Sequence, residues 1–145
     1  MDLVTQAVVG ATVALAAAPK PLTKRAALVG ALAGVAADVD TLFGATSDPL
    51  QILEFHRHFT HSLVFIPFGA TLLTLVIWLC SFRRWSWHSI WWFALLGYAT
   101  HGLLDACTSF GTHLYWPFTT ERTAWSIISV VDPLFTLPLV GLCIT

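Results

Sequence analysis

Long apolar stretches fill most of this sequence and constrain its fold more than any other feature. They cover residues 3–18, 26–44, 62–82, 89–110 and 126–145. A transmembrane helix needs about 20 mostly apolar residues, and these stretches meet or approach that length. Of the 145 residues, 57% are hydrophobic and 10% are charged, whereas soluble domains carry about 25% charged residues. We therefore expect an all-α, polytopic membrane bundle of about five transmembrane helices, with residues 1–145 forming one domain.

The basic residues of the expected loops predict an orientation. The first and third loops hold most of them: Lys20, Lys24, Arg25, Arg83 and Arg84. The second and fourth loops hold one each, Arg57 and Arg122. Cytoplasmic loops carry an excess of Lys and Arg, so the first and third loops are expected in the cytoplasm and the N-terminus outside. The net charge of −1 argues against nucleic acid as a partner, which leaves membrane lipids. The sequence sets no oligomeric state.

Ionisable residues within the apolar stretches mark a candidate site. Each costs about 2.5–3.5 kcal/mol on insertion scales, yet the stretches contain Asp38, Asp40, His101, Asp105 and Asp132. With a rise of about 1.5 Å per residue, all five are expected in one layer near the outer face. The histidines at positions 56, 58 and 61 precede the third stretch on that same side. This one-sided grouping predicts a site that faces the periplasm.

The residue types and their spacing indicate a metal site. His101 and Asp105 are four residues apart, so they share one helix face. Imidazole with carboxylate suits zinc, manganese or iron better than calcium or magnesium. Asp38 and Asp40 are two apart and can share a site only where the helix ends or unwinds. Arg57 follows His56, and a cation among histidines suits an anionic ligand.

Three other interpretations remain open at this point. The polar residues could serve structural hydrogen bonding, they could form the proton or ion relay of a transporter, or the protein could be a non-enzymatic scaffold. The sequence has no H-E-x-x-H motif, no G-x-S-x-G motif and no P-loop, so it lacks the motifs of zincins, α/β-hydrolases and P-loop NTPases.

Three sequence blocks in a fixed order carry a family resemblance: Ala37-Asp38-Val39-Asp40, His56-Arg57-His58-Phe59-Thr60-His61-Ser62, and His101-Gly102-Leu103-Leu104-Asp105. Together they resemble the membrane-bound, predicted metal-dependent hydrolases, whose best-known branch is the LexA-regulated hydrolases of the bacterial inner membrane. The tail around Asp132-Pro133 is similar to the longer-chain branch.

The resemblance implies a ligand set and a chemistry. The implied metal ligands are Asp38, Asp40, His56, His61, His101 and Asp105, with Arg57 as the arginine of the second block. We expect a divalent metal, zinc in preference to manganese, and two ions. The set is similar to that of zinc-dependent phospholipases C, which by analogy indicates phosphoester hydrolysis in a lipid or lipid-linked substrate.

The expected mechanism uses a metal-activated water whose pKa falls to about 7. Asp40 or Asp132 would orient or deprotonate that water. Arg57, together with Arg122, would neutralise charge on a phosphate oxygen.

The sequence departs from the family pattern at three positions. Ala37 replaces a usual proline, His58 replaces a usual glycine, and Gln6 stands where some relatives have histidine. The longer-chain branch also continues past residue 145, so a fragment or a shortened form is expected.

Overall fold

The computed structural model describes residues 1–40 and 57–144. Those residues form five α-helices: α1 (Leu3–Ala16), α2 (Thr23–Ala36), α5 (Ile66–Cys80), α6 (Trp87–Cys107) and α7 (Pro133–Ile144). Short 3-10 turns flank α2 and precede α5. The described ranges contain no strand, only an isolated bridge between Thr112 and Thr123. The all-α expectation is confirmed.

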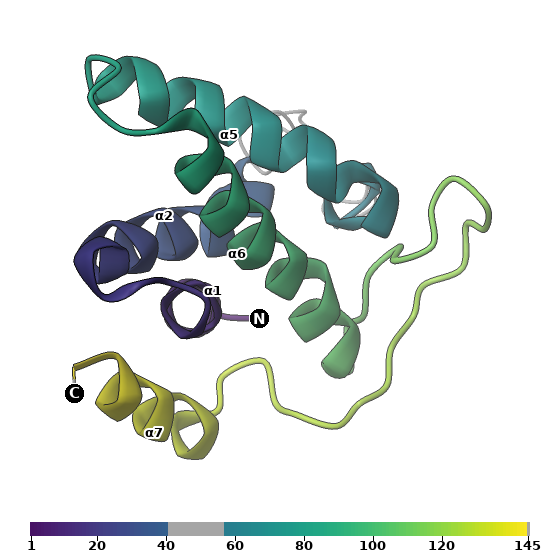
Figure 1. The fold of residues 1–145 in the computed structure, drawn as a ribbon. Coiled ribbons are helices and arrows are strands. Elements are labelled where there is room, and N and C mark those ends of the chain that lie inside the picture. The colour runs from purple at the N-terminus through teal and green to yellow at the C-terminus, as the bar shows by residue number, and fades with distance from the viewer. Residues whose placement is uncertain (41–56, 145) are drawn as a thin grey trace.

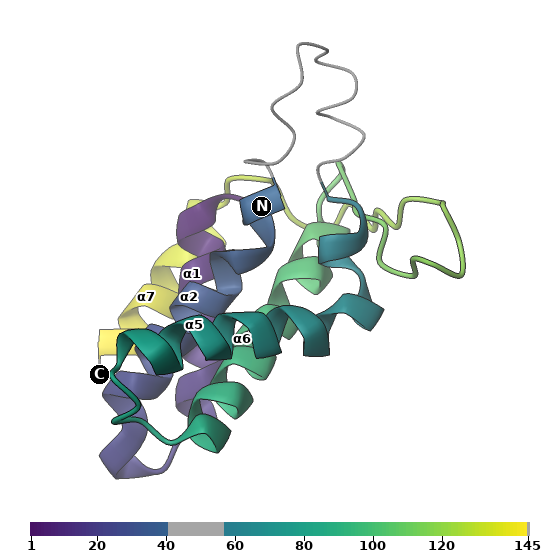
Figure 2. The same ribbon diagram turned by 90° about the horizontal axis from the view of Figure 1, so that it is seen from above.

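The helices α1, α2, α6 and α7 run alongside one another, and α5 crosses them (Figures 1 and 2). A long segment without helix, residues 108–132, connects α6 to α7 and loops away from the bundle. Glycines bring the helices into close contact. A Cβ on Gly30 would collide with the carbonyl oxygen of Gly10, and one on Gly97 would collide with that of Gly30. The small-residue pattern at Gly30 and Gly34 therefore joins α1, α2 and α6.

The outer face of α5 is apolar and exposed. Phe68, Leu72, Val76 and Leu79 are each at least half exposed, at 50–65%, and the spacing places them along one side of the helix. Only 17% of the segment Leu63–Cys80 is buried, whereas the core helix of a soluble protein is mostly buried. An exposed apolar face of this length fits contact with lipid.

Helix length and hydropathy together support fewer membrane spans than the sequence predicted. Among the described residues, Leu63–Cys80 is the one segment long and apolar enough to cross a membrane. Helices α1 and α2 have 14 residues each, which is about 21 Å at a rise of 1.5 Å per residue, against a hydrocarbon core of about 30 Å. Pro19 and Pro21 account for the early end of the first stretch, because proline cannot continue a helix.

Candidate metal centre

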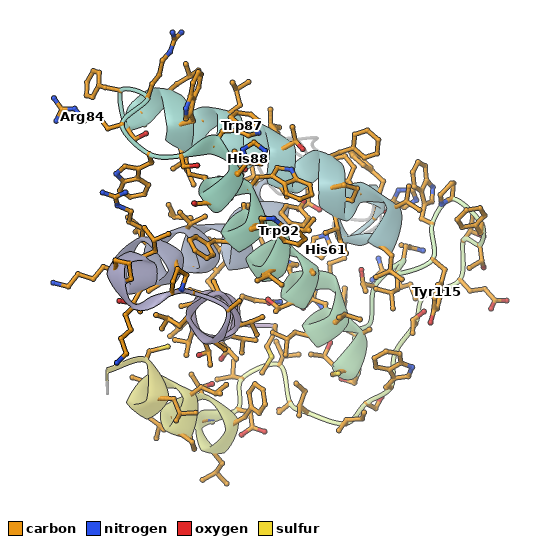
Figure 3. The ribbon with its side chains drawn as sticks, viewed as in Figure 1. His61, Arg84, Trp87, His88, Trp92 and Tyr115 are labelled. Carbon is orange, nitrogen blue, oxygen red and sulfur yellow. The ribbon has the colours of Figure 1, made fainter. Side chains whose placement is uncertain are left out.

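Four side chains from three separate segments converge at one end of the bundle. Asp38 lies in the 3-10 turn that follows α2, His61 lies before α5, and His101 and Asp105 lie in the last two turns of α6. One ligand atom from each falls within 4.8 Å of all the others. Figure 3 shows His61 on this side of the bundle, whereas Arg84 lies at the opposite end. This cluster of Asp38, His61, His101 and Asp105 is called the acceptor cluster below.

The segment that carries His61 is fixed by contacts with α6 and with the segment after it. The Leu63 N–H donates to the carbonyl oxygen of Leu114 at 3.0 Å. The carbonyl of His61 lies so close to Gly102 that a Cβ there would collide with it. The Ser62 hydroxyl donates to the carbonyl of Phe59 and accepts from a backbone N–H downstream. His61 is thereby held with only 2% of its surface exposed.

Hydrogen bonds fix the proton positions on the two histidines. The Nδ1 atom of His101 lies 2.5 Å from the carbonyl oxygen of Gly34. A carbonyl oxygen only accepts, so this nitrogen carries the proton. The Nδ1 atom of His61 lies 3.0 Å from Thr60 Oγ1, whose own hydrogen is directed to Asp40 Oδ2 at 2.8 Å. The hydroxyl oxygen therefore accepts from His61 Nδ1, and in both neutral rings Nε2 is a bare lone pair.

These two lone pairs face each other inside the acceptor cluster. His61 Nε2 lies 2.8 Å from His101 Nε2, and carboxylate oxygens of Asp38 and Asp105 approach both nitrogens at 3.3–3.5 Å. Four acceptor atoms at such distances repel one another unless a positive charge lies between them. The donor set therefore fits a cation.

Four of the six distances between ligand atoms suit tetrahedral coordination, whereas the 2.8 Å between His61 Nε2 and His101 Nε2 is shorter. Ligand atoms about 2.0–2.1 Å from a tetrahedral zinc ion lie about 3.3–3.4 Å from one another. The four nitrogen–oxygen distances among Asp38, His61, His101 and Asp105 are 3.5, 3.3, 3.4 and 3.5 Å. Two imidazoles with two carboxylates form a set that zinc accepts. The described residues thus form a site that could hold a metal ion.

The surroundings of His61 favour positive charge by a second route. Burial alone would lower the pKa of its imidazole, but hydrogen bonds to Asp105 and Asp38 and the negative charges of Asp105 and Asp40 outweigh burial. The pKa of His61 is therefore raised above its ordinary value. A proton on His61 Nε2 and a metal ion in the cluster would both neutralise the surrounding negative charge, so the two compete for this nitrogen.

Arg57 is buried beside the acceptor cluster. Its side chain lies against Asp105, with Nε 3.5 Å from Oδ2, and packs over the ring of Phe110 at 4.9 Å. Only 7% of the residue is exposed, and its Nη1 atom has no hydrogen-bond partner among the described residues. The backbone has φ +66°, a left-handed conformation that is uncommon for residues other than glycine. Hydrogen bonds to the N–H and to the carbonyl oxygen of Arg57 hold its backbone in this conformation.

The structure places the other residues expected at the site in different surroundings. Asp40 lies on the outer side of His61, near Nδ1, at 3.5 Å. Asp132 caps α7, where Oδ1 accepts from the Phe135 N–H at 3.1 Å, and it is outside the acceptor cluster. Arg122 stacks on Phe110 at 4.9 Å, as Arg57 does. His56 lies outside the described residues.

Two residues contact the site that spacing along the chain did not select. Thr60 contacts both His61 and Asp40; it stands in the second sequence block, but the sequence analysis expected no role for its hydroxyl. Gln6, on α1, donates from Nε2 to Asp105 Oδ1 at 3.2 Å and is fully buried. The Met1 amine also contacts that carboxylate. Gln6 thus reaches the site from the first helix, at the position that departs from the family pattern.

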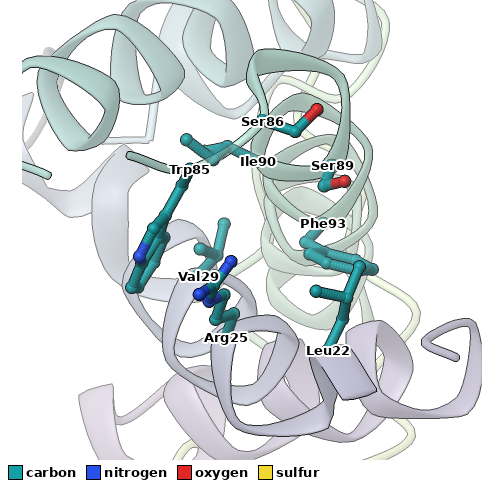
Figure 4. A pocket seen from close by; sticks show the side chains of 8 residues that line it. All are labelled: Leu22, Arg25, Val29, Trp85, Ser86, Ser89, Ile90 and Phe93. Atoms are coloured by element: carbon teal, nitrogen blue, oxygen red, sulfur yellow. The ribbon is translucent and has the colours of Figure 1, made fainter. Parts of the chain in front are cut away.

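The opposite end of the bundle has a different chemistry. A pocket there is lined by residues that include Arg25, Trp85, Ser86 and Ser89 (Figure 4). The Arg25 guanidinium lies over the Trp85 ring at 5.1 Å. No carboxylate or imidazole lines this pocket, and Asp38, His61, His101 and Asp105 form the one group of three or more potential metal ligands among the described residues.

Fold and site together define a class: a helical protein with an apolar outer face and a buried Asp/His cluster that can hold a metal ion. The chain belongs to the YdjM inner membrane protein family, whose sequence model matches residues 1–144. It is 30% identical over 135 residues to the inner membrane protein YbcI of Escherichia coli (strain K12), a match that covers 88% of this chain and 75% of that protein. No solved structure matches. These descriptions agree with the expected inner-membrane location, and they name neither a hydrolase activity nor regulation by LexA.

Proposed function

We propose that this protein is a membrane-embedded, metal-dependent hydrolase of the bacterial inner membrane that cleaves a phosphoester in a lipid or lipid-linked substrate. The observation that carries the proposal is the buried Arg57 guanidinium beside the acceptor cluster. A metal site that only stabilised the fold would not need a buried cation with an unused donor next to its ligands. A site that binds an anionic oxygen next to a metal ion needs both.

The described residues divide into two roles. Asp38, His61, His101 and Asp105 would hold the ion, zinc in preference to manganese. The ion would supply Lewis acidity and a water that ionises near neutral pH. Arg57 would donate from Nη1 to a phosphoryl oxygen and neutralise its charge as the ester bond breaks.

Four protein ligands form the closed set typical of structural zinc, so a catalytic site here needs a further coordination position for water, as in zinc sites that expand to five ligands. Asp38 is the one member of the acceptor cluster with an exposed side chain, at 17%, while the other three are at 0%. Water and substrate would therefore enter past Asp38. The expected second ion, with His56 as a ligand, and a base role for Asp40 or Asp132 stay predictions.

The test combines metal content with hydrolysis. Protein purified in detergent should contain about one zinc per chain by elemental analysis, and His101→Ala should lose it. The matched control is His88→Ala, which changes a histidine on the same helix at the exposed opposite end. The wild type should hydrolyse phosphate esters of lipids, and chelation should abolish that activity. Wild-type protein that binds no divalent metal would overturn the proposal.

Transport is the alternative. A relay through the protein needs polar groups that continue to the other side of the bundle. Among the described residues, the core in that direction is apolar and includes Ala26, Val29, Ile90 and Phe93. This apolar core argues against a relay. Solute uptake that depends on a proton gradient, in metal-free protein, would favour transport instead.

A further inference from the structure

Asp40 occupies a different position from the four residues of the acceptor cluster. It approaches His61 at Nδ1, 3.5 Å away, whereas the cluster forms around Nε2 of the same ring. Its Oδ2 atom accepts hydrogen bonds from the Thr60 hydroxyl at 2.8 Å and from the Arg57 N–H at 3.2 Å. One carboxylate oxygen of Asp40 thus contacts Thr60, which precedes the metal ligand His61, and also the backbone of the anion-binding Arg57.

The contact with Thr60 sets the chemical state of His61. A hydroxyl has one hydrogen, and Asp40 takes it. The Thr60 oxygen is then available only as an acceptor for His61 Nδ1, so the proton of the neutral ring stays on that side. The backbone of Thr60 is held in turn, because the Tyr98 hydroxyl donates to its carbonyl at 3.0 Å. Outer partners of this kind orient metal-binding histidines and raise their basicity.

The contact with Arg57 sets the direction of the guanidinium. Asp40 binds the backbone N–H on one side of this residue. On the other side its carbonyl accepts from the His113 N–H at 3.3 Å and from the Thr112 hydroxyl at 3.1 Å. A left-handed backbone persists only where its surroundings hold it. Asp40 is therefore one of the groups that keep the guanidinium against Asp105.

We propose that Asp40 is a positioning residue, which acts through Thr60 on the metal ligand His61 and through the backbone of Arg57 on anion binding. It is then not a ligand of the ion that the acceptor cluster would hold. The inference rests on the proposed metal site, and it deepens that proposal by naming the group that couples metal affinity to phosphate affinity. The effects of Asp40 and Thr60 are separable, because Asp40 accepts a hydrogen bond from the Arg57 N–H, whereas Thr60 acts on His61.

The experiment compares three variants with the wild type. Thr60→Val removes the hydroxyl at nearly constant volume, Thr60→Ser keeps it, and Asp40→Ala removes both contacts. Zinc affinity is measured by competition with a chelator, and inorganic phosphate affinity is measured on zinc-saturated protein. Thr71→Val is the matched control, since Thr71 lies on the exposed face of α5.

The expected results differ between the variants. Zinc affinity should fall about 10–100-fold in Thr60→Val and in Asp40→Ala, and Thr60→Ser should stay near the wild type. Phosphate affinity at saturating zinc should fall in Asp40→Ala alone. The visible spectrum of the cobalt-substituted protein should change in Thr60→Val while cobalt remains bound, which a loss of general stability would not produce. If Thr60→Val does not fold, Thr60→Ala serves as the second variant without a hydroxyl.

Two results would overturn the inference while leaving the proposed function intact. One is wild-type zinc affinity in all three variants. The other is complete loss of zinc in Asp40→Ala with no effect of Thr60→Val, because that pattern makes Asp40 a ligand. Phosphate affinity that is unchanged in Asp40→Ala would refute the role through Arg57. Absence of zinc from the wild type would overturn both the inference and the proposed function.

Discussion

At the scale of single residues, the site depends on where donors and acceptors are directed. With both histidines neutral, the acceptor cluster contains four acceptor atoms and no donor of its own, because Nδ1 of each histidine is engaged outside it. Arg57 shows the reverse imbalance, since its Nη1 donor has no acceptor among the described residues. A cation in the cluster and an anion at the arginine would satisfy both.

Substitution of Arg57 should separate the binding of metal from the binding of anions. Arg57→Ala should weaken inorganic phosphate binding about 10-fold to 100-fold, since a hydrogen bond to a charged group contributes about 1.5–3 kcal/mol. Zinc content should remain near the wild-type value, because the arginine is not a ligand. Isothermal titration of zinc-loaded protein measures the first quantity and elemental analysis the second. Equal phosphate affinity in both proteins would contradict the role given to Arg57.

Zinc affinity should depend on pH with a definite sign. The pKa of His61 is raised above 6.5, and a metal ion binds only the deprotonated nitrogen. Zinc affinity should therefore be highest above the raised pKa of His61 and should fall as the pH decreases through that pKa. Chelator competition between about pH 6 and pH 9 measures this, the range being chosen to span an ordinary imidazole pKa and values above it. A decline that begins only well below 6.5 would contradict the raised pKa.

At the scale of the elements, close helix contacts determine where the ligands lie. The backbone of Gly34 touches Gln6 on α1, and its carbonyl binds His101 on α6. One short segment of α2 therefore fixes the spacing of three helices and the orientation of one ligand. Small residues permit this approach, and any side chain at such a position would push the helices apart.

Gly34→Ala should lower both stability and zinc affinity. Its new Cβ would collide with the carbonyl oxygen of Gln6, and overpacking of this kind costs about 1–3 kcal/mol. Gly141→Ala is the matched control, because a Cβ there meets nothing within 4 Å. Thermal unfolding in detergent should show a lower midpoint for the first variant and little change for the second. Equal midpoints would show that α1 and α2 tolerate separation.

At the scale of the whole molecule, the two ends of the bundle differ in chemistry. The acceptor cluster and Arg57 lie at one end, while Arg25 and Trp85 line a pocket at the other. The expected orientation places the basic end in the cytoplasm and the metal end toward the periplasm. The exposed apolar side of α5 would face lipid between them.

Chemical labelling tests this orientation. In a variant without native cysteines, Glu121→Cys should react in intact cells with a maleimide that does not cross the inner membrane. Arg84→Cys should react only after that membrane is permeabilised. Both positions are exposed, so access to the reagent, and not burial, decides the outcome. The opposite labelling pattern would reverse the orientation and place the metal site on the cytoplasmic side.

The sequence by itself determined the features that depend on local spacing. The length of the apolar stretches predicted helices. The interval of four residues predicted that His101 and Asp105 share a face of α6, and in the structure His101 Nε2 lies 3.5 Å from Asp105 Oδ2. Gly30 and Gly34 are four residues apart, and this spacing of small residues lets helices approach closely. Each of these follows from the repeat of a single helix, so no knowledge of the partner elements was needed.

Only the tertiary structure decided what depends on atoms brought together from several segments. Asp38 and Asp40 are two residues apart and look equivalent in the sequence, yet Asp38 faces Nε2 of His61 and Asp40 faces Nδ1. Thr60 and Gln6 contact the site through packing alone. The ends of each helix also emerged from the fold, and Leu63–Cys80 is the one described segment both long and apolar enough to span a membrane. The physical reason is that a helix repeat fixes directions along one element, whereas ligand geometry depends on how several elements pack.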